Sequence, residues 1–211
     1  MRKFFILCGV FCVVFMAYAE AFSQKGFSIE LGLLYDKPQG SSNSRPYAGM
    51  EPGFGYTANL AYDFFDWGGL ELGVMHTSHT YRLAVIGGSV NEDDADKTTF
   101  FIRARVCPYK RGKIEVITSG GFGLFDIEGK HYIQPNLIDD DFSGPGYLVN
   151  FSLRYHITEG LTLAGFFGAN FVDYNRYEMF GYKADYSGDM PSGDSICWGI
   201  TIFHRIGIPQ L

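Results

Sequence analysis

The stretch NFSLRYHITEGLTLAGFFGANF, residues 150–171, reads as two alternating strands joined by a turn at residues 157–160. A period of two places alternate side chains on opposite faces of a β-sheet. Around the first strand, one face would carry Tyr147, Val149, Phe151, Leu153 and Tyr155, and the other Asn150, Ser152, Arg154 and His156. In a soluble barrel the apolar face lies inside, whereas in a membrane barrel it faces lipid. The identity of the inner face therefore decides between two kinds of fold.

Eight segments of the 211-residue chain show this alternation, at roughly 26–35, 53–64, 70–82, 98–108, 113–125, 147–156, 161–174 and 195–206. Most are long enough to cross a bilayer at a tilt, which takes about 9–11 residues. Long polar connections alternate with three short ones, which read FDWGG, YKRG and ITEG. Long loops would thus gather at one end and tight turns at the other, as in up-and-down membrane barrels.

The two faces differ in size and in charge. The apolar face holds too many bulky rings to fill an eight-stranded barrel, whose interior is only just wide enough for side chains. The other face is small and polar, and its charges balance: Glu30, Asp63, Glu71 and Glu115 against Arg103, Arg105, Arg154 and Arg205. Buried charges persist when they are paired. We therefore predict an all-β fold, an eight-stranded antiparallel up-and-down transmembrane β-barrel with its polar face inside.

The charged residues are expected to close the lumen. Counted from the tight turns, most of them fall in the turn-side half of the barrel: Asp63, Glu71, Arg105, Glu115, Arg154 and Arg205. We predict a plug of paired charges there. Above it, the smaller Gly, Ser and Asn positions are expected to form at most a blind, water-filled funnel.

The N-terminus has the features of a secretory signal peptide. Arg2 and Lys3 precede an apolar run, and Ala17-Tyr18-Ala19 forms a cleavage pattern, so we expect a signal peptide at 1–19 and a barrel domain at 20–211. Cleavage would leave 15 of the 17 basic residues against 23 acidic ones, a net charge of −8 that argues against nucleic acid as a partner. Cys107 and Cys197 would remain, near opposite rims, and are predicted to stay unpaired.

The strand pattern and the hairpin LRYHITEGLTLAGFFG resemble the small eight-stranded outer-membrane barrels of Gram-negative bacteria, the OmpA/OmpX/OmpW-like group. The resemblance covers nearly the whole chain. It implies a cell outer membrane location, with outer-membrane lipids, lipopolysaccharide, periplasmic chaperones and the barrel-insertion machinery as partners. The chain ends in HRIGIPQL, where such barrels usually have a terminal aromatic residue.

The stretch HTSH, residues 76–79, is the strongest candidate for a catalytic motif in the sequence. Alternation places His76 and Ser78 on the lipid-facing side, a layout that resembles PagL-like lipid A deacylases, in which a histidine activates a serine. No acid that would orient the histidine is evident, since Glu92 and Asp93 fall in an expected loop. Polar residues are also expected where a strand leaves the apolar zone, so no catalytic residue is assigned.

Three other patterns suggest a site but have simpler structural explanations. RPYAG, residues 45–49, is faintly similar to a motif of lipid A 3′-O-deacylases but is well explained as a turn with an interfacial tyrosine. The acidic runs 92–94 and 139–141 lack the spacing of a calcium loop and are expected to be solvated. His131, His156 and His204 are scattered and predict no zinc site. No metal and no cofactor are predicted.

The predicted function is that of an integral outer-membrane protein with a structural or surface-interaction role and a lumen filled by a charge network. An extracellular loop ligand would remain to be identified. Two alternatives stay open, a narrow channel and a lipid A-modifying hydrolase that uses His76 and Ser78.

Overall fold

The computed structural model describes residues 26–39, 50–65, 67–84, 90–133, 136–179, 182–185 and 193–206. These residues form β1 (Phe27–Pro38), β2 (Gly53–Phe65), β3 (Gly68–Ala84), β4 (Val90–Arg111), β5 (Ile114–Ile133), β6 (Asn136–His156), β7 (Leu161–Val172), β8 (Arg176–Met179), β9 (Tyr182–Asp185) and β10 (Ser195–Ile206). In the part of the chain so described, no helix is long and apolar enough to cross a membrane.

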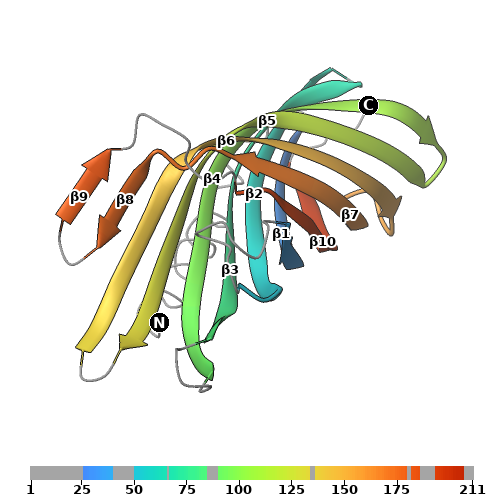
Figure 1. The fold of residues 1–211 in the computed structure, drawn as a ribbon. Coiled ribbons are helices and arrows are strands. Elements are labelled where there is room, and N and C mark those ends of the chain that lie inside the picture. Colours follow the sequence, from blue (N-terminus) through green and yellow to red (C-terminus); the bar gives the residue numbers. More distant parts are fainter. Residues whose placement is uncertain are drawn as a thin grey trace.

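Eight of the strands close into an antiparallel barrel (Figure 1). Strands β1 to β7 pair in chain order, and β10 lies between β7 and β1. Phe27 at the start of β1 is opposite Ile206 at the end of β10, so the first and last strands pair along their whole lengths. The predicted all-β, eight-stranded antiparallel fold is confirmed.

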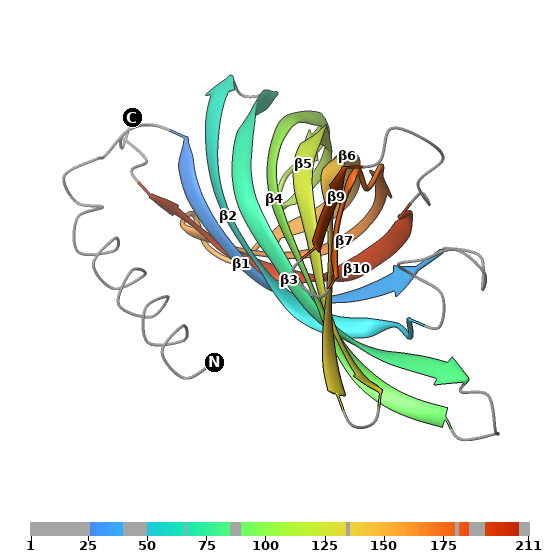
Figure 2. The same cartoon turned by 60° about the vertical axis from the view of Figure 1, so that its left-hand side comes forward.

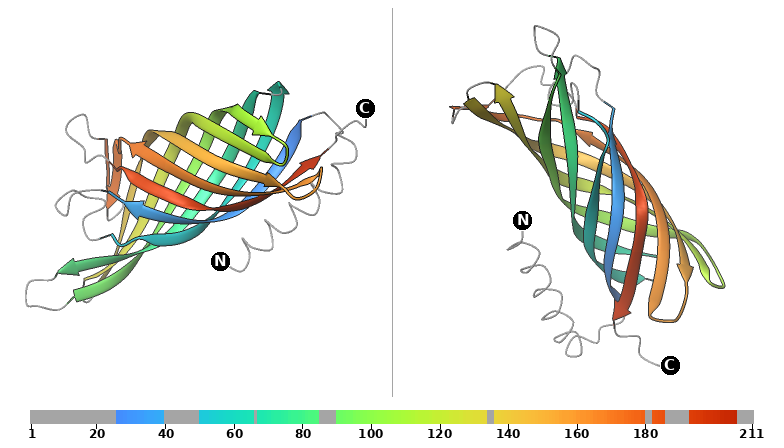
Figure 3. Two further views of the ribbon diagram at one scale, coloured as in Figure 1. Left: turned by 90° about the vertical axis from the view of Figure 1, so that its right-hand side faces the viewer. Right: turned by 90° about the horizontal axis from the view of Figure 1, so that it is seen from below.

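The barrel has a turn end and a loop end. At the turn end, short connections join β2 to β3, β4 to β5 and β6 to β7. The connection between β4 and β5 is residues 112–113, where Gly112 has a φ of 57°. A glycine adopts this left-handed conformation without the cost that a side chain would add. Figure 3 shows these turns at one end of the barrel and the long hairpins at the other.

The residues of the predicted apolar face point outward. Leu33, Phe54 and Leu124 are 67%, 73% and 66% exposed. Aromatic pairs stand near both ends of this apolar belt. The ring centroids of Tyr35 and Trp198 are 4.5 Å apart at the loop end, and those of Tyr62 and Phe64 are 4.9 Å apart at the turn end. Apolar walls edged by aromatic rings are typical of membrane barrels.

Three strands extend far beyond the segments that the sequence predicted. β4, β5 and β6 have 22, 20 and 21 residues, because two stretches expected to be loops continue as paired strand. Pairing between β4 and β5 stops at Ala95 and Gly129, and beyond this point the β3–β4 and β5–β6 hairpins diverge (Figure 2). Acidic residues are depleted in strands, which is why these two acidic stretches were expected to be loops. A hairpin whose faces are solvated nevertheless tolerates acidic side chains.

The connection between β7 and β10 contains a further hairpin. β8 pairs with residues 140–143 of β6, and β9 pairs with β8. Pro145 stands where β6 exchanges β7 for β8 as its neighbour, and its carbonyl accepts a hydrogen bond from the amide of Asp173. Proline has no N–H to donate, so it fits at a break in the ladder.

Candidate functional site

Glu30 is at the centre of the charged lumen. Its Oε1 accepts hydrogen bonds from Arg105 Nη1 at 3.0 Å and from Arg154 Nη2 at 2.7 Å. All three side chains are at most 5% exposed, and they come from β1, β4 and β6. Alternation brings them together, because each stands at an inward position of its strand. One carboxylate thus joins opposite walls of the barrel.

Asp63 connects this centre to the turn end. Arg105 binds it through two hydrogen bonds, Nε to Oδ1 at 2.7 Å and Nη2 to Oδ2 at 2.6 Å. Such a bidentate pair fixes both groups in one plane and is among the stronger hydrogen-bonded contacts in proteins. Arg205 approaches the same carboxylate less closely, with Nη2 3.6 Å from Oδ2.

Glu115 is the third acidic group of the network. Lys110 Nζ lies 3.4 Å from its Oε1, and Arg154 Nη1 and His156 Nε2 lie 3.9 Å and 3.6 Å from its Oε2. The other ring nitrogen of His156 is 2.8 Å from the Thr162 hydroxyl. Arg154 therefore bridges Glu30 and Glu115, and the sequence had not indicated that Lys110 belongs to the network.

Arg103 and Glu71 form a separate buried ion pair on β4 and β3. The Arg103 guanidinium also lies over the Phe101 ring, 4.1 Å from its centroid. With this pair, the structure places all eight charged residues of the predicted network in ion pairs inside the barrel. The space left among them at mid-lumen is about 20 Å³, so the described side chains fill the barrel at this level.

A second charged cluster lies closer to the loop end. Lys97 Nζ donates to Asp36 Oδ2 at 2.9 Å and to Ser195 Oγ at 2.8 Å. Asn170 Nδ2 donates to the same serine at 3.1 Å, and His79 Nε2 lies 3.5 Å from Asp36 Oδ2. All five side chains are buried. The sequence did not predict this cluster, because both charges were placed in loops.

The inward pattern contained the signal that could have found it. Asp36 follows Leu34 by two positions on β1, and Lys97 precedes Thr99 by two positions on β4, so each continues the inward set of its strand. The polarity of the surrounding sequence concealed this regularity. A strict period of two, extended until it fails, would have included both residues.

Bulky apolar side chains fill the lumen at the loop end, where at most a blind, water-filled funnel was predicted. The cluster comprises Leu34, Met50, Met75, Ala95, Phe101, Phe125, Ile127, Phe142, Leu148, Val172, Tyr174 and Cys197. Phe125 and Ile127 are at most 1% exposed. At the inward positions of the extended β5 and β6, large residues such as Phe125, Ile127 and Phe142 alternate with small ones, and together they fill this part of the lumen.

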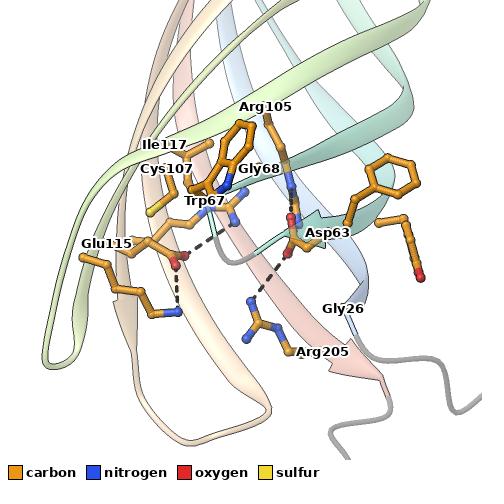
Figure 4. Close-up of a pocket in the computed structure, with 13 residues that line it drawn as sticks. Gly26, Asp63, Trp67, Gly68, Arg105, Cys107, Glu115, Ile117 and Arg205 are labelled. Carbon is orange, nitrogen blue, oxygen red and sulfur yellow. Dashed lines mark hydrogen bonds and ion pairs between the residues drawn. The ribbon is translucent and has the colours of Figure 1, made fainter.

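The hollow part of the barrel is at the turn end instead. We call it the vestibule, a cavity of about 620 Å³ lined by Gly26, Tyr62, Asp63, Phe64, Trp67, Gly68, Arg105, Cys107, Lys110, Glu115, Ile117, Arg154 and Arg205. Figure 4 shows Trp67 beside Cys107 and Ile117, with Asp63 between Arg105 and Arg205. The charged network forms the floor of this cavity.

His76 and Ser78 stand on the outward face of β3 at the loop end. Ser78 Oγ donates to Asp96 Oδ1 at 2.7 Å, and His76 Nε2 lies 3.9 Å from the same oxygen. His76 Nδ1 is 3.0 Å from the Thr98 hydroxyl. The acid that joins the pair is thus Asp96, directly opposite Ser78 on β4. In a Ser–His–acid triad the serine hydroxyl donates its hydrogen bond to the histidine, whereas here it donates to Asp96.

An acidic row crosses the outward face just beyond the apolar belt. Asp96, Glu128, Asp141 and Glu178 are paired in register across β4, β5, β6 and β8. Like charges directly opposite one another in a sheet are unfavourable. Among the described residues, no group of three or more acidic, histidine or cysteine side chains is arranged to hold a metal ion.

Cys107 and Cys197 are both free thiols, so the prediction that they stay unpaired is confirmed. Cys107 lines the vestibule, and Cys197 is buried at the loop end. The predicted signal peptide at 1–19 and RPYAG at 45–49 lie outside the described residues, as do the side chains of Glu92, Asp93 and His131.

No protein-family model matches the chain, and neither does the sequence of any curated protein. Solved structures do match. Neisserial surface protein A has a TM-score of 0.59 at 13% identity, covering 86% of this chain and 97% of that one. OprG from Pseudomonas aeruginosa has 0.60 at 11%, covering 85% and 95%. A major outer membrane protein from Thermus thermophilus has 0.58 at 15%, covering 84% and 98%. The chain thus has the fold of small outer-membrane barrels, as the resemblance implied.

Proposed function

We propose that the chain is an integral outer-membrane protein with a sealed barrel, whose role is structural or surface-interacting. The closed lumen is the observation that carries this proposal. Ion pairs around Glu30 leave about 20 Å³ of space at mid-lumen, and an apolar cluster fills the loop end. Such an interior supports a scaffold more than a pore. The outward apolar belt and the shared fold support insertion in the outer membrane.

The surface-interacting part of the proposal rests on the loop-end hairpins. β3–β4, β5–β6 and β8–β9 extend beyond the apolar belt, and the acidic row crosses several of these strands. Extended, paired strands present a more rigid surface than loops of the same length would. A partner at the cell surface would meet this acidic sheet first.

The proposed route to the membrane follows from the N-terminal sequence. A cleaved signal at 1–19 would export the chain, periplasmic chaperones would carry it, and the barrel-insertion machinery would insert it among outer-membrane lipids and lipopolysaccharide. Cell fractionation with N-terminal sequencing of the mature protein tests this route. Recovery of uncleaved protein in the inner membrane would contradict it.

A sealed barrel makes a clear prediction for conductance. Purified protein in planar bilayers should show no steady ion current, while a large porin measured in the same bilayers supplies the positive control. The proposed exposure of the loop-end hairpins is tested by labelling the β5–β6 hairpin from outside intact cells. A steady, reproducible conductance would favour the narrow channel instead.

A second candidate function, a lipid A-modifying hydrolase, is favoured by one observation. His76, Ser78 and Asp96 gather on the outward face where the apolar belt gives way to acidic residues. Mass spectrometry of lipid A from cells expressing the protein tests this activity. Loss of an acyl chain that Ser78→Ala abolishes and Ser143→Ala preserves would establish it. Unchanged lipid A would leave the scaffold role.

A further inference from the structure

We propose that the vestibule at the turn end binds a small amphipathic anion, an apolar or aromatic body that carries a phosphate or carboxylate group. This site would lie on the side of the barrel opposite the acidic hairpins and is independent of the surface role proposed above. Its volume of about 620 Å³ is in the range of about 300–1,000 Å³ that is typical of small-molecule sites.

The vestibule contains more positive than negative charge. Arg105, Lys110, Arg154 and Arg205 line it, against Asp63 and Glu115. Glu30 beneath the floor pairs with both Arg105 and Arg154, which makes four basic groups against three acidic ones. The carboxylates are therefore shared, and one positive charge is in excess. An anion that enters would balance the set.

The basic groups nearest the opening are held most loosely. Arg205 is 25% exposed and 3.6 Å from Asp63, and Lys110 is 50% exposed and 3.4 Å from Glu115. A close charge-assisted hydrogen bond measures about 2.7–2.9 Å, so neither contact is fully formed. Both side chains have room to turn toward a ligand without breaking the buried pairs beneath.

The floor offers an additional donor. Arg154 is only 4% exposed, and its Nε has no hydrogen-bond partner among the described residues. A buried donor without a partner is unfavourable. Because Arg154 also lines the vestibule, an acceptor that reaches the floor would relieve this cost.

One wall of the vestibule is apolar. Trp67, Cys107 and Ile117 lie together there (Figure 4), and Trp67 leaves 58% of its surface exposed although it lies over the interior. An exposed indole in a cavity provides a flat surface on which an aromatic or apolar body can pack. The anionic group and the apolar body would thus bind to different sides of the same cavity.

The native thiol in this wall makes the proposal testable. Cys107 is free and accessible in the vestibule, whereas Cys197 is 4% exposed and lies at the other end of the barrel. The reaction of Cys107 with neutral methyl methanethiosulfonate is followed by mass spectrometry of its peptide, on folded protein in micelles. Phenyl phosphate is the probe, and inorganic phosphate is the matched anion without an apolar body.

We expect phenyl phosphate to slow the labelling of Cys107 in a saturable manner. Burial of a ring is worth about 1.5–3 kcal/mol, so it should protect at a concentration at least about tenfold lower than inorganic phosphate. Arg205→Gln should raise the protecting concentration by roughly tenfold, the effect of losing one hydrogen bond to a charged group. Lys37→Gln, which removes an exposed charge at the loop end, should change nothing.

Folding of each variant is checked by its heat-modifiable migration on gels, and Lys110→Gln at the opening is the second variant should Arg205→Gln fail to fold. Three results would overturn the proposal. They are absence of protection at any soluble concentration of phenyl phosphate, equal protection by the two anions, and protection that the folded Arg205 or Lys110 variant leaves unchanged.

Discussion

Glu30 in the lumen and Glu128 on the outward face of β5 are the same side chain in opposite surroundings. Glu30 is 4% exposed and accepts hydrogen bonds from two arginines. Glu128 is exposed and stands in register between Asp96 and Asp141, so its cross-strand neighbours have the same charge. One region concentrates opposite charges away from water, and the other arranges like charges in water.

Both side chains carry the same charge, so the difference in burial accounts for their different roles in stability and in surface contacts. In the lumen, the low polarity strengthens attraction and makes each unpaired charge costly, so the network fixes the strands around it. On the hairpins, water and salt screen repulsion, so a row of acids is tolerated and remains accessible to a partner. The lumen is therefore expected to govern stability, and the acidic row to govern contacts outside the barrel.

The largest effect is expected from Glu30→Ala. It leaves the Arg105 and Arg154 guanidiniums without their shared acceptor in a buried site, and breaking a buried pair costs about 3–5 kcal/mol. Urea unfolding of the protein in micelles measures the free energy of unfolding. Glu128→Ala removes the same side chain from the acidic row and should change it by no more than about 0.5 kcal/mol. Equal effects would remove the distinction between the two regions.

A smaller loss is expected from Lys97→Ala at the loop end. This change leaves Asp36 buried without the ammonium that lies 2.9 Å away, and about 2–3 kcal/mol should be lost. Adding Asp36→Asn removes the stranded charge and should recover part of the loss. Measuring Lys97→Ala, Asp36→Asn and the double variant gives the coupling energy between the two side chains. Additive losses would show that the pair does not act as a unit.

The features that the sequence predicted are those that alternation alone determines. It assigned Glu30, Arg105 and Arg154 to the same face, and in a narrow closed barrel residues on that face meet. The outward position of Phe54 follows from the same period. These predictions needed the number of strands but not their exact register.

The features that it missed depend on register or on segment length. Asp96 joins Ser78 only because β3 and β4 pair with these two residues opposite each other, and the local sequence does not set that alignment. Asp36 and Lys97 were assigned to loops because polar residues are poor strand formers. The vestibule was missed for a similar reason, since the pairing register shifts near residues 63–65 and 106–109, close to Trp67 and Cys107 in its wall.

Arg205→Gln should have a small effect on stability, which sharpens the comparison within the lumen itself. Its contact with Asp63 is 3.6 Å long and its side chain is 25% exposed, so water replaces much of what is lost. Partly exposed ion pairs contribute about 0–1 kcal/mol, and a loss within that range is expected in urea unfolding. A loss as large as that of Glu30→Ala would place Arg205 in the buried network.

The smallest effect, of opposite sign, is expected from Asp126→Asn. Asp126 is at an outward position of β5, beyond the exposed Leu124 that ends the apolar belt, and burial together with the nearby Glu128 carboxylate raises its pKa. A carboxyl whose pKa is higher in the folded state than in the unfolded state favours folding when protonated, and this contribution is lost as pH rises through the folded-state pKa. Asp126→Asn should therefore raise the free energy of unfolding near pH 7 by a few tenths of a kcal/mol, within the roughly 0.5 kcal/mol that is usual for substitutions at the surface. The gain should shrink below pH 4, where the native carboxyl is protonated as well.

Unfolding curves of Asp126→Asn and the native protein near pH 7 and below pH 4 measure this difference. A destabilised variant at pH 7 would mean that Asp126 is held by attraction, as Glu30 is.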